Sequence, residues 1–127
     1  MADKFSVTIT RASKDLTRAE QIKLTTLNDS VGLDTMLRDA TNPVVVDVDY
    51  YAILHIDNPN GKNGPVSYNK IVIVDEDGTK YITGSSVFIR EFTTLSDLVE
   101  GEPFSIRVLR KPTKSDPTRH YLTCMIA

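Results

Sequence analysis

The first third of the chain mixes a period-two pattern with helix signals. Residues 5–10 (FSVTIT) alternate apolar and polar side chains, which predicts a short strand. Thr17 followed by Glu20 three positions later fits a capping box, in which each side chain satisfies a backbone amide of the first helical turn. We therefore expect an N-terminal lobe, residues 1–43, made of a strand at 5–10 and helices at 19–27 and 33–40.

From Val44 onward the period is two, which is typical of strands. One helix interrupts this region at 87–99, because Phe88, Phe92, Leu95 and Val99 recur at helical spacing behind a capping Ser85 or Ser86. Dense turn residues mark loops at 58–65 and 112–118, and Asp77-Gly78 marks a tight hairpin. The expected strands are 44–56, 66–74, 80–83, 104–110 and 120–126.

This order of three strands, a helix and two strands is that of the oligonucleotide- and oligosaccharide-binding (OB) fold. We therefore expect a mainly β (α+β) protein with an OB-fold-like five-stranded barrel, in which the helix lies between strands 3 and 4. Barrel 44–127 and lobe 1–43 would form a single domain, 1–127. Such barrels bind ligands across strands two and three and with two loops, here 58–65 and 112–118.

Composition agrees with one soluble globular domain: 127 residues, 40% of them hydrophobic and 25% charged. The single Cys124 excludes an internal disulfide. No apolar run approaches the ~20 residues of a membrane helix, and the N-terminus lacks the apolar region of a signal peptide. We expect a cytoplasmic protein that does not bind membranes.

The net charge of −2 argues against a protein that holds nucleic acid by its overall charge. The charges are segregated, however, because residues 105–121 carry five basic side chains and one acidic one. One short segment is therefore the basic part of an acidic protein.

Catalytic and metal-binding signatures are absent from the sequence, which contains no phosphate loop, dinucleotide fingerprint, nucleophile elbow or H-E-x-x-H. His120 with Cys124 would leave a zinc site incomplete. Two groups of acidic residues could in principle bind a cation: Asp47, Asp49 and Asp57 form one, and residues 75–77 form the other. Both groups are more typical of strand flanks and turns than of metal sites. We expect no enzyme, no metal and no cofactor.

Basic residues interleaved with aromatic ones give the best candidate for function. Single-stranded nucleic acid is held by cations along its phosphates and by aromatic rings on which unpaired bases stack. We assign Phe88, Phe92 and Phe104 to the core with Tyr50, and Tyr51 to a more exposed face. The candidate nucleic-acid-binding residues are Tyr51, Tyr68, Lys70, Lys80, Tyr81, Arg107, Arg110, Lys111, Lys114, Arg119 and Tyr121.

Several segments together carry a family resemblance: LTRAEQIKL, YAILHIDNPN, YNKIVIVDEDGTKYITGSSVFIREF and GEPFSIRVLRKPTKS with YLTCMIA. The chain resembles the small single-stranded DNA-binding proteins of tailed bacteriophages that infect Gram-positive bacteria. The resemblance implies non-catalytic coating of single-stranded DNA during phage replication or recombination, with little sequence preference. It places Lys80 and Tyr81 on the binding face, and Arg110, Lys111 and Lys114 along the DNA backbone.

Partners beyond single-stranded DNA are less defined. The final YLTCMIA differs from the acidic tail of cellular bacterial single-stranded DNA-binding proteins, so tail-mediated recruitment of host enzymes is not expected. Other phage replication or recombination proteins and a homo-oligomer stay open as partners.

Two alternatives to DNA binding also stay open. The first is a structural or adaptor protein whose basic hairpin docks an acidic protein partner. The second is an RNA-binding OB domain, because the choice between DNA and RNA depends on a contact at the 2′-hydroxyl that no sequence pattern reveals.

Overall fold

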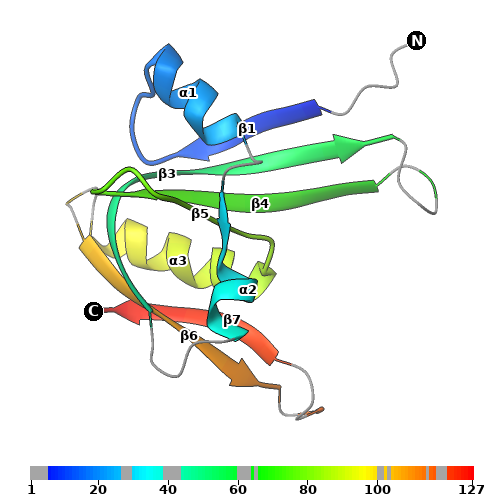
Figure 1. Cartoon of the computed structure of the whole chain (residues 1–127), viewed down its shortest axis with the longest axis vertical. Helices are drawn as coiled ribbons and strands as arrows, with labels where there is room; N and C mark the ends of the chain where they lie inside the picture. The colour runs from blue at the N-terminus through cyan, green and yellow to red at the C-terminus, as the bar shows by residue number, and fades with distance from the viewer. Residues whose placement is uncertain are drawn as a thin grey trace.

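Strands make up most of the structure, and they join into one curled mixed sheet with helices beside it (Figure 1). The computed structural model describes residues 6–26, 30–38, 44–59, 64, 66–99, 102, 104–113, 115–116 and 120–127. The strands are β1 (Ser6–Ala12), β2 (Val31–Gly32), β3 (Val44–Asn58), β4 (Val66–Asp75), β5 (Lys80–Thr83), β6 (Phe104–Pro112) and β7 (His120–Ile126). The helices are α1 (Arg18–Thr25), α2 (Leu33–Arg38) and α3 (Ser86–Leu98).

The local signals at the helix starts are confirmed. The Glu20 amide donates to Thr17 Oγ1 at 3.2 Å and the Thr17 amide donates to Glu20 Oε1 at 2.9 Å, which completes the capping box of α1. Ser85 caps α3 by accepting from the Phe88 amide at 3.3 Å. The two-residue β2, which pairs with β5 in parallel, has no counterpart among the predicted elements.

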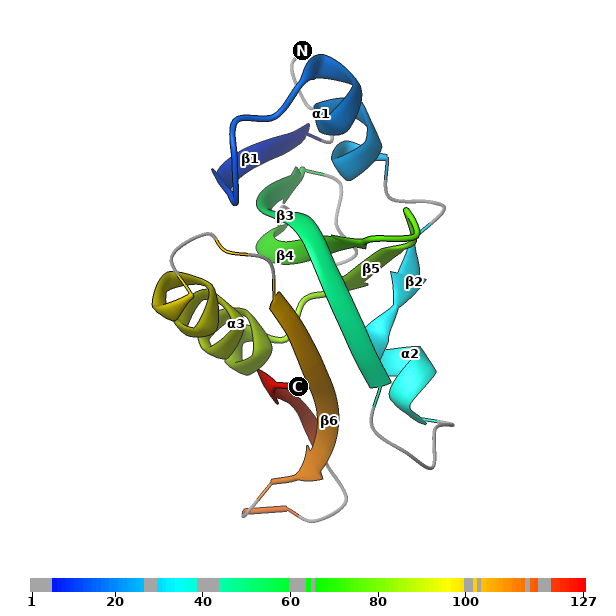
Figure 2. The ribbon, with the colours of Figure 1, turned by 90° about the vertical axis from the view of Figure 1, so that its left-hand side faces the viewer.

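The sheet follows the order β2-β5-β4-β3-β6-β7, and β1 also pairs with β3. Strand β3 organises this arrangement because β4 covers one edge, while β6 and then β1 pair with successive halves of the other edge. Figure 2 shows the result, with β1 and α1 at one end of the molecule and β6 with β7 at the other. The predicted β-rich class is confirmed as a curled half-barrel, in which the described residues of β5 and β7 do not pair to close a barrel.

A β-bulge in β3 decides which side chains face which core. Val48 pairs with Asp75 and Tyr50 pairs with Val74, so Asp49 is the extra residue. Because one extra residue reverses the alternation of side chains, Tyr51 continues the face that Val48 begins, while Tyr50 turns to the opposite face.

Two cores result, one on each face of the curled sheet. The inner face packs against α3 and contains Tyr51, Ile71 and Ile106 among its buried residues. The outer face packs under β1 and α1 and contains Tyr50, Leu54 and Val72. As predicted, α3 supplies Phe88 and Phe92 to the inner core. Within the described part of the chain, no helix is long and apolar enough to cross a membrane.

Candidate nucleic-acid interface

The outer ends of β3 and β4, residues 54–58 and 66–70, form an arm that projects beyond β5 (Figure 1). On β4, Tyr68 and Lys70 pair with Ile56 and Leu54, so both belong to the outer face of the sheet. The Tyr68 side chain is 38% exposed, and Lys70 Nζ lies 5.9 Å from the centre of its ring, within cation–π range. The arm therefore presents an aromatic ring and a cation together in solvent.

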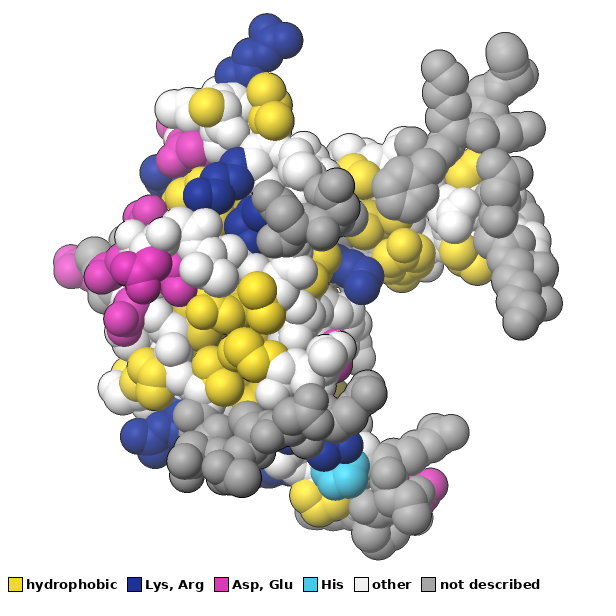
Figure 3. All heavy atoms as spheres, viewed as in Figure 1, with side chains coloured by type: hydrophobic (Ala, Val, Ile, Leu, Met, Phe, Trp, Pro, Cys, Tyr) yellow, Lys and Arg dark blue, Asp and Glu magenta, His cyan; other side chains and the backbone are white. Residues whose placement is uncertain are grey.

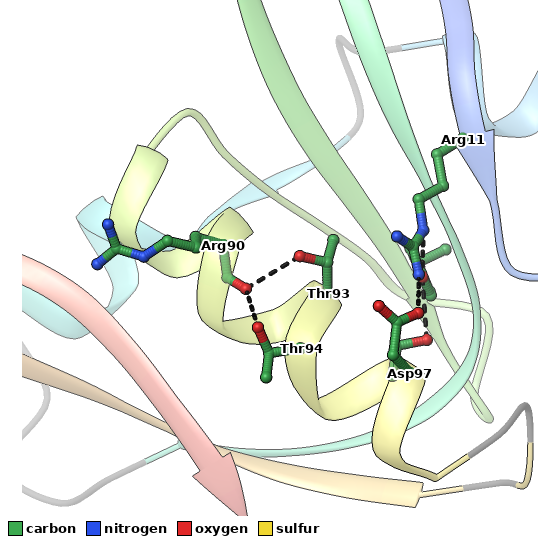
Figure 4. Close-up of polar contacts among 7 residues, drawn as sticks. Arg11, Arg90, Thr93, Thr94 and Asp97 are labelled. Carbon is green, nitrogen blue, oxygen red and sulfur yellow. Dashed lines mark hydrogen bonds and ion pairs between the residues drawn. The ribbon is translucent and has the colours of Figure 1, made fainter.

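A cleft of about 280 Å³ lies between the arm and the first turns of α3. It exists because β5 ends at Thr83, where the chain leaves the edge of β4 and enters the helix. Arg90 is its basic residue, and its guanidinium points away from α3 into solvent (Figure 4). The residues that line the cleft are Tyr68, Asn69, Gly84, Ser86, Ile89 and Arg90, none of them acidic.

The basic segment of β6 is divided between the two faces. Arg107 pairs with Met125 and Lys111 with Tyr121, which places these four residues on the outer face. Arg110 pairs with Leu122 and shares the inner face with His120 and its partner Pro112. The side chains of Arg107, Arg110 and Lys111 are exposed, and that of Tyr121 is partly buried.

Figure 3 shows a hollow on one side of the molecule, between the arm and the end of the β6–β7 hairpin. Basic side chains lie on both borders of this hollow, and a histidine lies on the border formed by the hairpin. A chain-like anion in the hollow would meet cations from strands that are far apart in the sequence.

Tyr51 is the first correction to the predicted interface, because it is buried and not the more exposed tyrosine. The side chain is 1% exposed and its ring packs edge-on against Phe92, with centroids 4.7 Å apart. Its hydroxyl donates to Ser96 Oγ at 2.9 Å and accepts from Arg11 Nε at 3.2 Å. Arg11 also pairs with Asp97 at 2.5 Å (Figure 4), so Tyr51 links β1, β3 and α3.

Lys80 is the second correction, because its side chain points into the protein and not toward a ligand. It is 5% exposed, and Nζ donates to the carbonyl oxygens of Lys23 at 2.9 Å and Thr26 at 2.6 Å. These carbonyls lie at the C-terminal end of α1, where a cation is stabilised by the helix dipole. Lys80 thus fastens α1 to β5.

Tyr81 is partly buried, and its hydroxyl donates to Asp75 Oδ2 at 3.3 Å. Burial and then the Asp75 charge raise the pKa of the Tyr81 phenol above its usual value. Lys114 and Arg119 lie outside the described residues.

Arg90 and Asn69 are two polar residues of the cleft that the sequence did not predict. Arg90 occupies the solvent-facing side of an amphipathic helix, a position at which a basic residue carries no distinguishing signal. Asn69 lies within a predicted strand, and only its position in the lining of the cleft makes it a candidate.

Polar side chains on the inner face of the arm form a second cluster. His55 Nδ1 lies 2.9 Å from Asn69 Oδ1, and His55 Nε2 lies 3.3 Å from Asp57 Oδ1. Ser67 Oγ donates to the same Asp57 oxygen at 2.5 Å. Because the carboxylate stands between the hydroxyl and the imidazole, His55 does not contact Ser67 as the base of a catalytic triad would.

Several of the acidic residues considered as metal ligands have other contacts. Asp47 accepts from Ser105 Oγ at 2.5 Å, and Asp57 contacts Ser67 and His55. Among the described residues, no group of three or more histidine, cysteine or acidic side chains is arranged to hold a metal ion.

Comparisons with protein-family models, with curated proteins and with solved structures each found no match to this chain. Inference about function therefore rests on the residues of the chain itself.

Proposed function

We propose that this protein binds single-stranded DNA without catalysing a reaction and with little sequence preference. The observation that carries the proposal is the exposed Tyr68 ring beside Lys70, at the mouth of a cleft that also holds Arg90. An exposed ring beside one cation, with a second cation in the same cleft, is the combination that favours single-stranded nucleic acid.

Each of the three side chains has a separate role. An unpaired base stacks on Tyr68, a contact worth about 1–3 kcal/mol per base. Lys70 and Arg90 contact the phosphates on either side of that base. Because stacking and phosphate contacts read neither the Watson–Crick edge nor the order of the bases, binding tolerates many sequences.

The path continues from the cleft through the hollow to Arg110 at the end of the β6–β7 hairpin. Support for this direction comes from the succession β3, β4, β5, α3, β6, β7, which matches the element order of an OB fold. In that fold the ligand crosses the second and third strands, which correspond to β4 and β5. We therefore propose an OB-type barrel whose binding face is centred on β4.

The biological setting follows from the resemblance in the sequence. We propose that the protein coats single-stranded DNA during the replication or recombination of a bacteriophage, in the cytoplasm of the infected cell. Other phage replication or recombination proteins are then its natural partners.

Fluorescence anisotropy tests the proposal with the full chain and labelled (dT)20, a 20-base-pair duplex and (rU)20. We expect tight binding of (dT)20 and much weaker binding of the duplex, whose paired bases cannot stack on Tyr68. Stronger binding of (rU)20 than of (dT)20 would favour an RNA-binding domain. A complete lack of response to both single strands would contradict the proposal and favour the adaptor alternative.

A further inference from the structure

His55 occupies a position on the arm that the proposed interface does not use. It lies on β3 between Leu54 and Ile56, which face the outer core, so the His55 side chain is on the inner face. This side chain is 38% exposed. Both ring nitrogens lie near oxygen atoms, Nδ1 near Asn69 and Nε2 near Asp57. Asn69 in turn lines the cleft, so the imidazole is joined directly to the proposed binding site.

The protonation state of His55 decides how well this arrangement is satisfied. A neutral imidazole has one N–H group and can donate to only one of the two oxygens, whereas the doubly protonated form donates to both. Ser67 holds Asp57 Oδ1 through a further hydrogen bond, which fixes the carboxylate opposite the ring. The geometry therefore favours the imidazolium.

Among the described residues of the neighbouring elements, few other charges face His55. On β1 its partner is the uncharged Thr8, and Arg11 lies farther along that strand, held by Asp97 and Tyr51. On β4 its neighbours are Ser67 and Asn69, and Arg90 of α3 is the cation on the other side of the cleft. Asp57 is thus the charge that a proton on His55 would directly compensate.

We propose that His55 couples proton uptake to the binding of single-stranded DNA, so that the arm binds DNA more strongly when His55 is doubly protonated. This inference rests on the proposed function. When His55 is neutral, the uncompensated Asp57 carboxylate repels phosphates near the cleft. When His55 is protonated, the pair is neutral and Lys70 and Arg90 act on the phosphates unopposed.

The groups around His55 shift the pH at which its imidazole gains a proton. The side chain of Asn69 and then the charge of Asp57 raise the pKa of His55 above its ordinary value of 6.5. Affinity is therefore expected to fall as the pH rises above 6.5 and through the raised pKa. By linkage, bound DNA must raise the pKa of His55 in return.

The experiment measures the affinity for (dT)20 at pH 6.0 and pH 8.5, because thymine does not titrate in this range. We expect wild type to bind roughly fivefold more tightly at pH 6.0, the lower end of typical coupling energies. His120→Gln removes the second histidine, which lies near the proposed path, and should keep most of this difference. His55→Gln and Asp57→Asn should lose most of this difference. The imidazole signals in an NMR titration give the pKa of His55 with and without DNA, and the pKa should rise with DNA.

The possible failures are distinguishable. If wild type binds (dT)20 equally at both pH values, or if only His120→Gln abolishes the difference, the coupling through His55 is wrong while the proposed function stands. If the NMR titration shows the same pKa of His55 with and without bound DNA, the coupling is also wrong. If wild type binds no DNA at any pH, the proposed function fails and this inference fails with it.

Discussion

The arm and the rest of the sheet, which we call its base, carry similar side chains that lie in opposite environments. At the arm, Tyr68 and Lys70 are on the surface, with the amine near the ring. At the base, Tyr51 is buried against Phe92, and the Lys80 amine is held by carbonyls of α1. Tyrosines and lysines in strands of one sheet thus include both interface candidates and structural residues.

The difference arises from what lies over each part of the sheet. The inner face at the base is covered by α3, and the outer face is covered by β1 and α1. On the arm, β1 and α1 still cover Leu54 and Ile56 of β3, but Tyr68 on the neighbouring β4 stays exposed because β5 ends before it. Burial here depends on the second layer of the fold rather than on the residue type or the strand pattern.

The largest expected effect separates the two tyrosines by stability. Tyr51→Ala should lower the free energy of unfolding by about 3–5 kcal/mol, as for other large aromatic truncations in a core, because it leaves a cavity beside Phe92. Tyr68→Ala should change it by less than about 0.5 kcal/mol, as a surface substitution. Urea denaturation followed by circular dichroism measures both. Equal losses would contradict the distinction between base and arm.

The two lysines should differ in the same direction. Lys80→Met removes the ammonium that donates to the backbone carbonyls of Lys23 and Thr26. It should destabilise the protein by about 1.5–3 kcal/mol, as for hydrogen bonds to charged groups. Lys70→Met is the matched control and should unfold at the wild-type urea concentration. Hydrogen exchange should show faster exchange of the α1 amides in Lys80→Met only. Unchanged protection of α1 would show that Lys80 does not fasten this helix.

The basic residues of β6 sharpen the account of the DNA path. Arg110 lies on the inner face of the hairpin, opposite Leu122, whereas Arg107 lies on the outer face, opposite Met125 and Val45. Arg110→Gln should reduce the slope of log affinity against log salt by about 0.7, the value for one phosphate contact on a single strand. Arg107→Gln should leave the slope unchanged. The reverse result would place the path on the outer face of the hairpin.

The smallest expected effect concerns His55 and the stability of the arm. A pKa raised above 6.5 in the folded state means that the stabilisation is fully present below pH 6.5 and is lost as the pH rises through the folded-state pKa. Wild type should therefore be more stable than His55→Gln at pH 6.0, with the difference shrinking by pH 8.5. Thermal melts at the two pH values measure this. A constant difference between the two proteins would exclude a contribution from the proton.

Much of the fold is predictable because the local signals agree with the final structure. The Thr17 capping box, the Phe88 and Phe92 stripe and the Asp77-Gly78 turn each use contacts between residues near in sequence. The three helices and six of the seven described strands therefore fall at the expected positions. Strand β2 lacks a signal because two residues show no period and because β5, with which it pairs, is distant in the sequence.

The candidate site is less predictable because it depends on how distant segments meet. The bulge at Asp49 reverses the alternation between Val48 and Tyr50, and the faces of Tyr50 and Tyr51 are both covered, so alternation alone could not show that neither tyrosine is exposed. The cleft is lined by residues of β4 and of α3, among them Arg90. In the sequence, Arg90 looks like any other solvent-exposed arginine.

The most direct test of the account is the affinity for (dT)20 of wild type, Tyr68→Phe and Tyr68→Ala at one salt concentration. If a base stacks on this ring, Tyr68→Phe should bind like wild type, while Tyr68→Ala should lose about 1–3 kcal/mol of binding free energy. All three proteins should unfold at the same urea concentration. Equal affinity of Tyr68→Ala and wild type would contradict the central claim that the arm is the surface that binds DNA.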